Sequence, residues 1–329
     1  MSIGPRKRVQ KPPSSPSGAT QVREFSDNAL AQILFGPHNS HLERIEKHLG
    51  VTLNGRGNAV AISGGKDTTA EAVRVLDELY NLAGNQGHLE SADVDGALRM
   101  GDSGGVPEDG NALQTRKRRI SPRTPVQADY LDAMAHHELV FGLGPAGTGK
   151  TYLAVAKAVT MMIAGEVDRI VLSRPAVEAG ERLGFLPGDL KEKVDPYLRP
   201  LYDALHDMLP GDQVIKKMAA GDIEVAPLAF MRGRTLANSF VILDEAQNTT
   251  PVQMKMFLTR MGENSRMVIT GDLSQVDLPI GARSGLQDAL DTLQGIEDIG
   301  FIHFTHRDVV RHSLVAKIIR AYDKNKVHT

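Results

Sequence analysis

The sequence predicts an α/β protein in which a mostly parallel, buried sheet follows a smaller α+β unit. From about residue 124 onward, short apolar strand-like segments alternate with segments of helical spacing. A glycine-rich loop lies between one such strand and the following helix, at residues 144–151. Residues 22–82 carry a separate pattern of helices and strands, and a length of 329 residues accommodates two domains of ordinary size.

The composition excludes several classes of protein. Hydrophobic residues are 41% and charged residues 24%, which is typical of a soluble globular protein. The absence of Cys excludes disulfides, thiolate ligands and a Cys nucleophile, and it fits a reducing cytoplasm. The formal net charge of −2 excludes a uniformly basic protein, so a polyanion must be bound by a local patch. No secretory signal and no apolar run long enough to cross a membrane is present, so we expect a cytoplasmic protein.

Residues 1–21 are predicted to be a disordered basic tail, because Pro, Ser and basic residues dominate the segment. The basic residues Arg6, Lys7, Arg8 and Lys11 are compatible with a solvated tail or with RNA contact.

Residues 22–82 predict a compact unit in the order helix, strand, strand, helix. Leu42, Ile45 and Leu49 recur at helical spacing and end at Gly50. The order resembles a small KH-type module, which clamps single-stranded RNA with a GxxG loop. The corresponding turn, 36–39, reads Gly-Pro-His-Asn and lacks the second glycine. An RNA-clamping module and a docking or oligomerisation module both remain open.

Residues 83–123 are predicted to be a flexible linker, acidic and glycine-rich at first and then basic. The basic part consists of the run Arg116-Lys117-Arg118-Arg119 and of Arg123. It is typical either of a solubilising hinge or of a surface that contacts a phosphate backbone.

Residues 124–329 predict one domain with a buried, mostly parallel sheet. Apolar runs predict strands at 139–143, 170–173, 223–225, 240–243, 267–270 and 301–304.

A phosphate-binding loop of the pattern GxxxxGK[ST] follows the first of these strands. Its residues are Gly144, Pro145, Ala146, Gly147, Thr148, Gly149, Lys150 and Thr151. The glycines let backbone N–H groups point at phosphate oxygens, and the following helix adds the positive end of its dipole. We expect Lys150 to neutralise the β- and γ-phosphates and Thr151 to ligate Mg²⁺. The sequence therefore predicts an ATP site.

Two carboxylates follow the apolar strand at 240–243, where parallel sheets bind their ligands. Adjacent acids in this place can also cap a helix, but after a P-loop they indicate a Walker B pair. We expect Asp244 to hold Mg²⁺ and Glu245 to deprotonate the attacking water. This pair favours hydrolysis over a metabolic P-loop kinase.

Two glutamines complete the predicted site. Gln275 follows the strand at 267–270 and resembles the γ-phosphate sensor of superfamily 1 helicases. Gln127 lies upstream of the P-loop and resembles the adenine-reading Gln of the same superfamily. The domain is therefore predicted to be a single RecA-like P-loop NTPase core of the superfamily 1 helicase type.

Longer motifs resemble the PhoH family of phosphate-starvation-inducible ATPases. They lie at residues 174–181, 183–189, 196–203, 226–235 and 308–312. The resemblance implies a cytoplasmic Mg²⁺-dependent ATPase of RNA metabolism, with RNA unwinding in some members. It also implies association with the endoribonuclease that matures ribosomal RNA.

The C-terminal domain has room for one RecA-like lobe, whereas a strand-translocating motor needs two. We therefore predict a homo-oligomeric ring, such as a hexamer, with ATP at subunit interfaces. Arg311 is the expected arginine finger, and Arg307 lies nearby. A surface pairing of either with Asp308 is the alternative. Arg174, Arg232 and Arg234 are candidates for RNA contact or for internal ion pairs.

Two functions remain open. One is an ATPase coupled to RNA remodelling, and the other is an ATP-switched oligomeric scaffold that docks a partner nuclease without unwinding RNA.

Overall fold

The computed structural model describes residues 19–102, 112–175, 190–279 and 281–310, and of residues 190–196 it describes the backbone alone. The chain divides into two compact units, with the boundary between Val94 and Asp95. Of the predicted basic tail, residues 1–18 lie outside the described residues.

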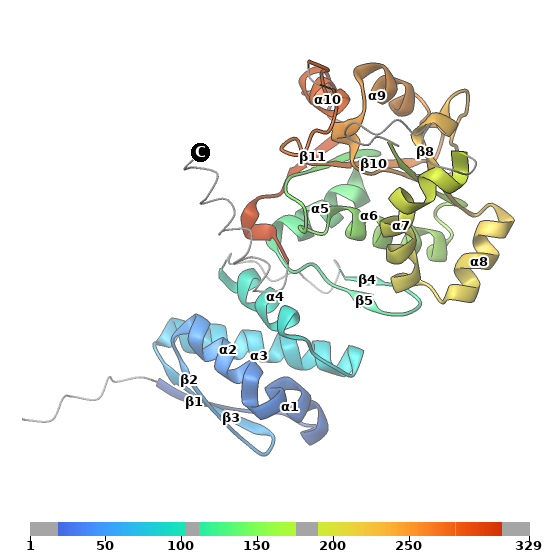
Figure 1. Ribbon diagram of the computed structural model, residues 1–329. Helices are drawn as coiled ribbons and strands as arrows, with labels where there is room; N and C mark the ends of the chain where they lie inside the picture. Colours follow the sequence, from blue (N-terminus) through green and yellow to red (C-terminus); the bar gives the residue numbers. More distant parts are fainter. Residues whose placement is uncertain (1–18, 103–111, 176–189, 280, 311–329) are drawn as a thin grey trace, which may run out of the picture. The chain divides into compact units, whose positions relative to one another are not determined.

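The N-terminal unit is a three-stranded antiparallel sheet with helices on one face (Figure 1). Residues of both layers are fully buried between them, among them Leu34, Ile45, Ile62 and Leu76. Its elements are β1 (Ala19–Glu24), α1 (Asn28–Phe35), α2 (Ser40–Leu49), β2 (Thr52–Arg56), β3 (Ala59–Gly64) and α3 (Lys66–Gln86), and its strand order is β1-β3-β2.

The order predicted for this unit was incomplete, because β1 precedes the first helix and two helices precede β2. Strand β1 is an edge strand, and Gln21, Val22 and Arg23 on its two faces are all exposed. Such a strand shows no alternation of apolar and polar residues. The turn between α1 and α2 has positive φ at Gly36, His38 and Asn39. The KH-type interpretation stays a prediction.

The predicted flexible linker is wrong over its described part. Helix α3 extends to Gln86, and α4 (Ser91–Asp102) follows, with Leu98 and Met100 buried. Strands β4 (Leu113–Gln114) and β5 (Arg119–Ile120) form a hairpin whose Leu113 and Ile120 belong to the core of the C-terminal unit. The many acidic and glycine residues concealed these apolar positions.

The C-terminal unit is built on a six-stranded, fully parallel sheet, and all six predicted strands are present. The strand order is β11-β6-β10-β9-β7-β8. The strands are β6 (Leu139–Leu143), β7 (Arg169–Arg174), β8 (Ile223–Pro227), β9 (Ser239–Leu243), β10 (Arg266–Gly271) and β11 (Ile299–His303).

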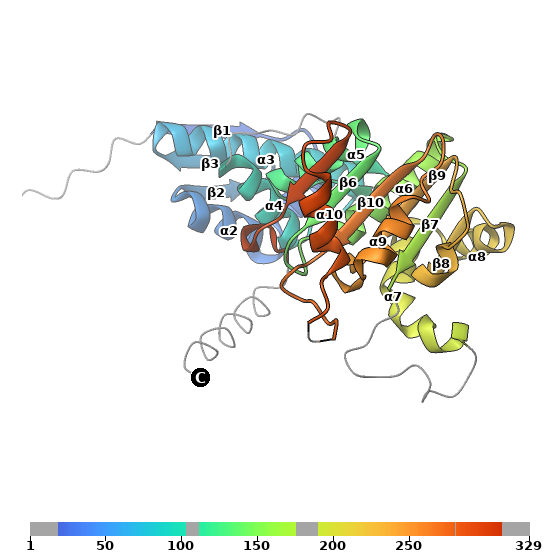
Figure 2. The ribbon, with the colours of Figure 1, turned by 90° about the horizontal axis from the view of Figure 1, so that it is seen from above.

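Helices cover both faces of this sheet (Figure 2). Helices α5 (Pro125–His136), α6 (Lys150–Ala164), α7 (Leu190–Met208) and α8 (Gly211–Ala220) pack on one face. Helices α9 (Pro251–Leu258) and α10 (Gly285–Leu293) pack on the other. Successive strand residues such as Ile242 and Leu243 alternate between the two cores, as the pleat requires. The architecture is an α/β, RecA-like P-loop core.

No helix among the described residues is long and apolar enough to cross a membrane. Because all six strands are parallel, their carboxyl ends meet at one edge of the sheet, which brings together the loops that follow β6, β9 and β10.

Candidate nucleotide-binding site

The P-loop joins β6 to α6 and requires its glycines. Gly144, Gly147 and Gly149 all have positive φ, which L side chains rarely adopt. A Cβ at Gly144 would also collide with the backbone carbonyl of Phe304. Gly144 N donates 3.1 Å to Gly271 O, so the P-loop is joined to the end of β10.

Lys150 opens α6 and is largely buried in the loop. Its Nζ donates to Gly144 O at 2.6 Å and to Pro145 O at 2.8 Å. No side chain caps the N-terminus of α6, where Gly149 is the N-cap residue. The uncapped N–H groups of the helix and the Lys150 ammonium thus belong to the same loop and helix start, as an anion site requires.

Thr151 and Asp244 meet across the gap between α6 and β9. Thr151 Oγ1 donates 2.6 Å to Asp244 Oδ1, and Thr270 Oγ1 donates 2.7 Å to the same oxygen. Asp244 is buried, and its backbone N–H bonds to Ser173 O at 2.9 Å. A hydroxyl beside a carboxylate is a hard oxygen donor set, which fits Mg²⁺.

Glu245 is held in the left-handed region, with φ of 52°. A non-glycine residue in this conformation is strained by about 1–3 kcal/mol and is common at functional sites. The conformation places the Glu245 carboxylate in the same cavity as the P-loop, beside Asp244.

Gln247 fixes the Glu245 carboxylate, and the sequence did not single it out. Its Nε2 donates to Glu245 Oε2 at 2.6 Å and to Gln275 O at 3.2 Å. Its Oε1 accepts from Asp272 N at 3.0 Å. Gln247 is only 1% exposed. The one signal in the sequence was a polar residue directly after the Walker B pair.

Gln275 lines the cavity, at the end of the loop after β10. Its Nε2 donates 2.8 Å to Asp272 Oδ2, and Asp272 Oδ1 accepts from both N and Oγ of Ser274. The buried Asp272 therefore orients the Gln275 amide near Glu245.

Gln127 forms a hydrogen bond to the backbone of the P-loop. Its Nε2 donates 2.9 Å to Thr148 O, and its Oε1 accepts from Arg123 N at 2.6 Å. The residue is buried, and both ends of its amide bond to backbone. The described geometry thus gives Gln127 a role in holding the loop, and adenine reading stays a prediction.

The three arginines predicted to contact RNA or to form ion pairs differ in their contacts. Arg174 forms ion pairs with Asp244 at 3.7 Å and with Glu245 at 3.5 Å. Arg234 forms a bidentate pair with Glu224 at 2.7 and 2.6 Å, which raises the pKa of Arg234. Both Arg174 and Arg234 therefore form internal ion pairs, as the alternative to RNA contact predicted. Arg232 is exposed.

The predicted arginine finger, Arg311, lies outside the described residues. Arg307 is exposed, and the described contacts of the buried Asp308 are with Thr305, whose N and Oγ1 donate at 2.8 and 2.9 Å. Thr305 and Asp308 form a capping box, so Asp308 has a structural role that needs no arginine.

The loops enclose a cavity of about 600 Å³, a volume that accommodates a nucleotide. Its walls include the P-loop, both Walker B carboxylates, Arg174 and Gln275. The far wall comes from Tyr152 and from α7, through Pro200, Asp203, Ala204 and Asp207. Except for the undescribed Arg311, the predicted catalytic and metal residues therefore line one cavity, whereas Gln127, predicted to read adenine, does not line it.

The basic cluster lies on the β4–β5 hairpin, against the C-terminal end of α7. Arg116, Lys117 and Arg118 are exposed. Lys117 Nζ donates 2.7 Å to His206 O, where a cation complements the helix dipole. Arg118 pairs loosely with Asp207 at 3.6 Å. The basic residues therefore stand on a folded hairpin of the C-terminal unit.

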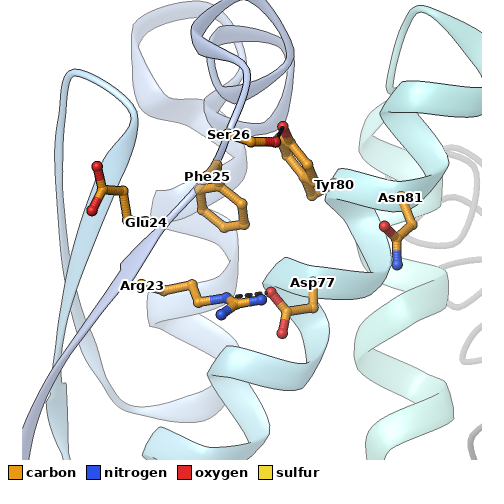
Figure 3. A pocket seen from close by; sticks show the side chains of 7 residues that line it. All are labelled: Arg23, Glu24, Phe25, Ser26, Asp77, Tyr80 and Asn81. Atoms are coloured by element: carbon orange, nitrogen blue, oxygen red, sulfur yellow. Dashed lines mark hydrogen bonds and ion pairs between the residues drawn. The ribbon is translucent and has the colours of Figure 1, made fainter.

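A second hollow, of about 400 Å³, lies in the N-terminal unit (Figure 3). Arg23 Nε donates 2.7 Å to Asp77 there, and Phe25 stacks on Tyr80 with ring centroids 4.7 Å apart. Because Glu24 and Asp77 outnumber Arg23, the hollow does not favour a phosphate.

The comparisons with known proteins agree with this site. The model of the family described as PhoH-like protein matches residues 119–323. A PhoH-like protein of Bacillus subtilis (strain 168) is 52% identical over 304 residues, 91% of this chain and 95% of that protein. One from Synechocystis sp. is 44% identical over 95% of this chain and 96% of that protein. Protein PhoH of Escherichia coli (strain K12) is 46% identical over 67% of this chain and 63% of that protein.

Among solved structures, the Sulfolobus solfataricus SWI2/SNF2 ATPase core gives a TM-score of 0.30 at 15% identity, over 51% of this chain and 34% of that chain. The site is that of a nucleotide-hydrolysing NTPase. With a family model matching residues 119–323 and relatives aligned over nearly their whole length, the chain belongs to the PhoH-like protein family.

Proposed function

We propose that this protein hydrolyses ATP with Mg²⁺ and couples hydrolysis to work on RNA. The observation that carries the proposal is the hydrogen bond of 2.6 Å between Thr151 and Asp244, with Glu245 adjacent on the same cavity wall. It joins the P-loop helix to the Walker B strand at the point where a nucleoside triphosphate would present its terminal phosphates.

Each residue has a distinct task in hydrolysis. The P-loop N–H groups and the N-terminus of α6 bind the phosphate oxygens, and Lys150 turns from two loop carbonyls toward the β- and γ-phosphates. Thr151 and Asp244 would hold Mg²⁺, which when bound neutralises phosphate charge and orients the phosphates.

Glu245 is the expected base. It accepts a proton from the attacking water while Gln247 holds its second oxygen at 2.6 Å. Gln275, oriented by Asp272, is placed to bond that water or the γ-phosphate. The carboxylate pair beside the P-loop supports water as the acceptor.

The RNA component is supported by the exposed basic hairpin residues Arg116, Lys117 and Arg118, which lie next to α7, a wall of the nucleotide cavity. A fixed cluster of cations is the local patch that a polyanion needs in a chain of net charge −2. Cytoplasmic action alongside an endoribonuclease that matures ribosomal RNA, and RNA contact by the KH-like unit, belong to the same proposal.

A ring of identical subunits is part of this proposal, since the described C-terminal unit contains one RecA-like sheet. In such a ring Arg311 of one subunit would act at the site of the next. Native mass spectrometry with and without ATP measures the oligomeric state. A monomer under both conditions contradicts the ring.

Release of phosphate by purified protein tests the function, measured with Mg²⁺, without it, and with single-stranded RNA. We expect Mg²⁺-dependent turnover that RNA accelerates, and loss of turnover with retained ATP binding in Glu245→Gln. Normal turnover by Glu245→Gln would remove the proposed base. Turnover that ignores RNA but changes when the nuclease is added would instead establish the ATP-switched scaffold.

A further inference from the structure

Arg174 occupies a position that the strand register fixes. It is the last residue of β7, and Ser173 is the register partner of Leu243 on β9. Asp244 N donates 2.9 Å to Ser173 O, so the backbone at Arg174 is level with the Walker B pair. The guanidinium therefore reaches the carboxylates from the neighbouring strand of the same chain.

The contacts of Arg174 are loose compared with those of a structural ion pair. Its Nη1 lies 3.7 Å from Asp244 Oδ2 and its Nη2 lies 3.5 Å from Glu245 Oε1. Arg234, in contrast, makes two parallel hydrogen bonds of 2.7 and 2.6 Å to one carboxylate, Glu224. Among the described residues, the strong bidentate geometry of arginine is thus satisfied at Arg234, whereas Arg174 makes no such pair.

The side chain of Arg174 is 23% exposed and lines the nucleotide cavity. It is the one arginine among the described residues of that lining. Lys150 of the P-loop lines the same cavity. A phosphate chain bound to the P-loop would accordingly share that cavity with two cations.

Charge balance indicates what Arg174 does when Mg²⁺–ATP binds. Asp244 and Glu245 share one guanidinium, and Asp244 belongs to the donor set that fits Mg²⁺. A divalent cation and a guanidinium repel each other and compete for that carboxylate. Engagement of Asp244 by the metal would leave the fork of Arg174 available to the oxygens of the terminal phosphate, which its planar geometry matches.

We propose that Arg174 is a catalytic residue that binds the γ-phosphate within the same chain and stabilises the charge that develops on it. This inference rests on the proposed ATP hydrolysis. It makes the arginine contribution at least in part intramolecular, in addition to any arginine supplied by a neighbouring subunit.

Arg174→Ala and Arg174→Lys test the role, with the exposed Arg232→Ala as a matched control. The measurements are turnover and the affinities for fluorescent ATP and ADP in the presence of Mg²⁺. We expect Arg174→Ala to lower turnover by about 10³-fold or more, as loss of an arginine finger does. ATP should lose its affinity advantage over ADP, whereas ADP affinity stays within about two-fold, which also establishes folding. Turnover of Arg174→Lys should lie between that of the wild type and that of Arg174→Ala, because lysine keeps the charge and loses the planar pair of N–H donors.

Turnover of Arg174→Ala within about three-fold of the wild type overturns the inference. So does an equal loss of ATP and ADP affinity, which would make Arg174 a structural residue. An inactive wild type overturns the proposed function itself, and the two failures are therefore distinct.

A mixing experiment checks the intrachain assignment. Arg174→Ala is combined with Lys150→Ala, and the mixture is assayed for turnover. We expect no recovery, because no subunit then has both cations at one site. Recovery of activity would mean that Arg174 acts on a neighbouring subunit and would overturn the intrachain role.

Discussion

The amide of Gln247 donates a hydrogen bond of 2.6 Å to the carboxylate of Glu245, and the same amide binds the loop that carries Gln275. The proposed base and the loop of the proposed sensor are therefore held by one side chain. Gln247→Ala should slow hydrolysis by about 10- to 100-fold, the range expected when a supporting residue of a site is lost. ATP affinity should change little, because Gln247 does not line the cavity.

The same substitution leaves the buried N–H of Asp272 without its acceptor, which costs about 1–3 kcal/mol of folding free energy. Chemical denaturation measures this cost. Unchanged turnover in a folded Gln247→Ala protein would show that Glu245 needs no such support.

Gly144→Ala should abolish nucleotide binding. Gly144 has φ of 136°, and a Cβ there would collide with the carbonyl of Phe304. Gly165→Ala is the matched control: φ is 76°, but the new methyl group would meet no neighbouring side chain or loop within 4 Å. The free energy of unfolding of the control should fall by only about 1 kcal/mol, as it does for Gly-to-Ala changes at left-handed positions. The control should bind nucleotide normally. Isothermal titration with ATP compares them, and equal affinity in both variants would contradict the steric argument.

Thr151→Ala should raise the Mg²⁺ concentration needed for half-maximal turnover by about ten-fold or more, because a proposed ligand of the metal is lost. Its hydroxyl lies 2.6 Å from Asp244. Thr160→Ala is a suitable control, since the Thr160 hydroxyl bonds only to Ala156 O in the described contacts, on the same helix. The test is a Mg²⁺ titration at saturating ATP. An unshifted midpoint for Thr151→Ala would remove it from the metal site.

Replacing Arg116, Lys117 and Arg118 by Gln should weaken RNA binding and flatten its dependence on salt. Each phosphate contact to a single strand contributes about 0.7 to the slope of log K against log salt, so three contacts contribute about 2. Lys255→Gln is the control for a single charge, because Lys255 is exposed on α9, on the other face of the sheet. Fluorescence anisotropy with oligouridylate at several salt concentrations measures the slope. An unchanged slope would exclude the hairpin as a phosphate contact.

Tyr130→Phe should leave the protein as stable as the wild type or stabilise it by about 1 kcal/mol. The Tyr130 hydroxyl is fully buried and has no hydrogen-bond partner among the described residues. Burial, together with the charge of Asp244, raises the pKa of Tyr130 and keeps it protonated. Removing an unsatisfied hydroxyl removes a desolvation cost. Thermal unfolding compares the variants, and a loss above about 2 kcal/mol would reveal an essential partner of the hydroxyl.

The sequence predicted the parts of the fold that depend on local pattern. The four inner strands β6, β7, β9 and β10 are buried on both faces, so each reads as an apolar run. The P-loop follows from backbone requirements visible as glycines. Strand β1 was missed because its exposed edge position imposes no pattern. Helix α4 was missed because its buried Leu98 and Met100 stand among acidic residues and glycines.

The gathering of Lys150, Thr151, Asp244 and Glu245 around one cavity was predictable, because their motifs follow strands of one parallel sheet, and their tasks stay predictions. A contact that depends on strand order was not predictable. Arg174 reaches the carboxylates because β7 is the neighbour of β9, a pairing across about 70 residues of chain that no local pattern contains. Gln127 shows the converse, since its motif predicts a ligand contact while its amide bonds to the backbone at Thr148 and Arg123.

The backbone of Gln247 accepts a hydrogen bond of 2.8 Å from Ser284, the residue immediately before α10, while Gly285 N donates 2.7 Å to Thr249 O. The loop after Glu245 is thus hydrogen-bonded to the start of a helix on the face of the sheet opposite α6. If Glu245 moved during turnover, these hydrogen bonds would change and the first turn of α10 would open more or less often. Amide hydrogen exchange at the start of α10 would then report the phosphate state of the site at the carboxyl edge of the sheet.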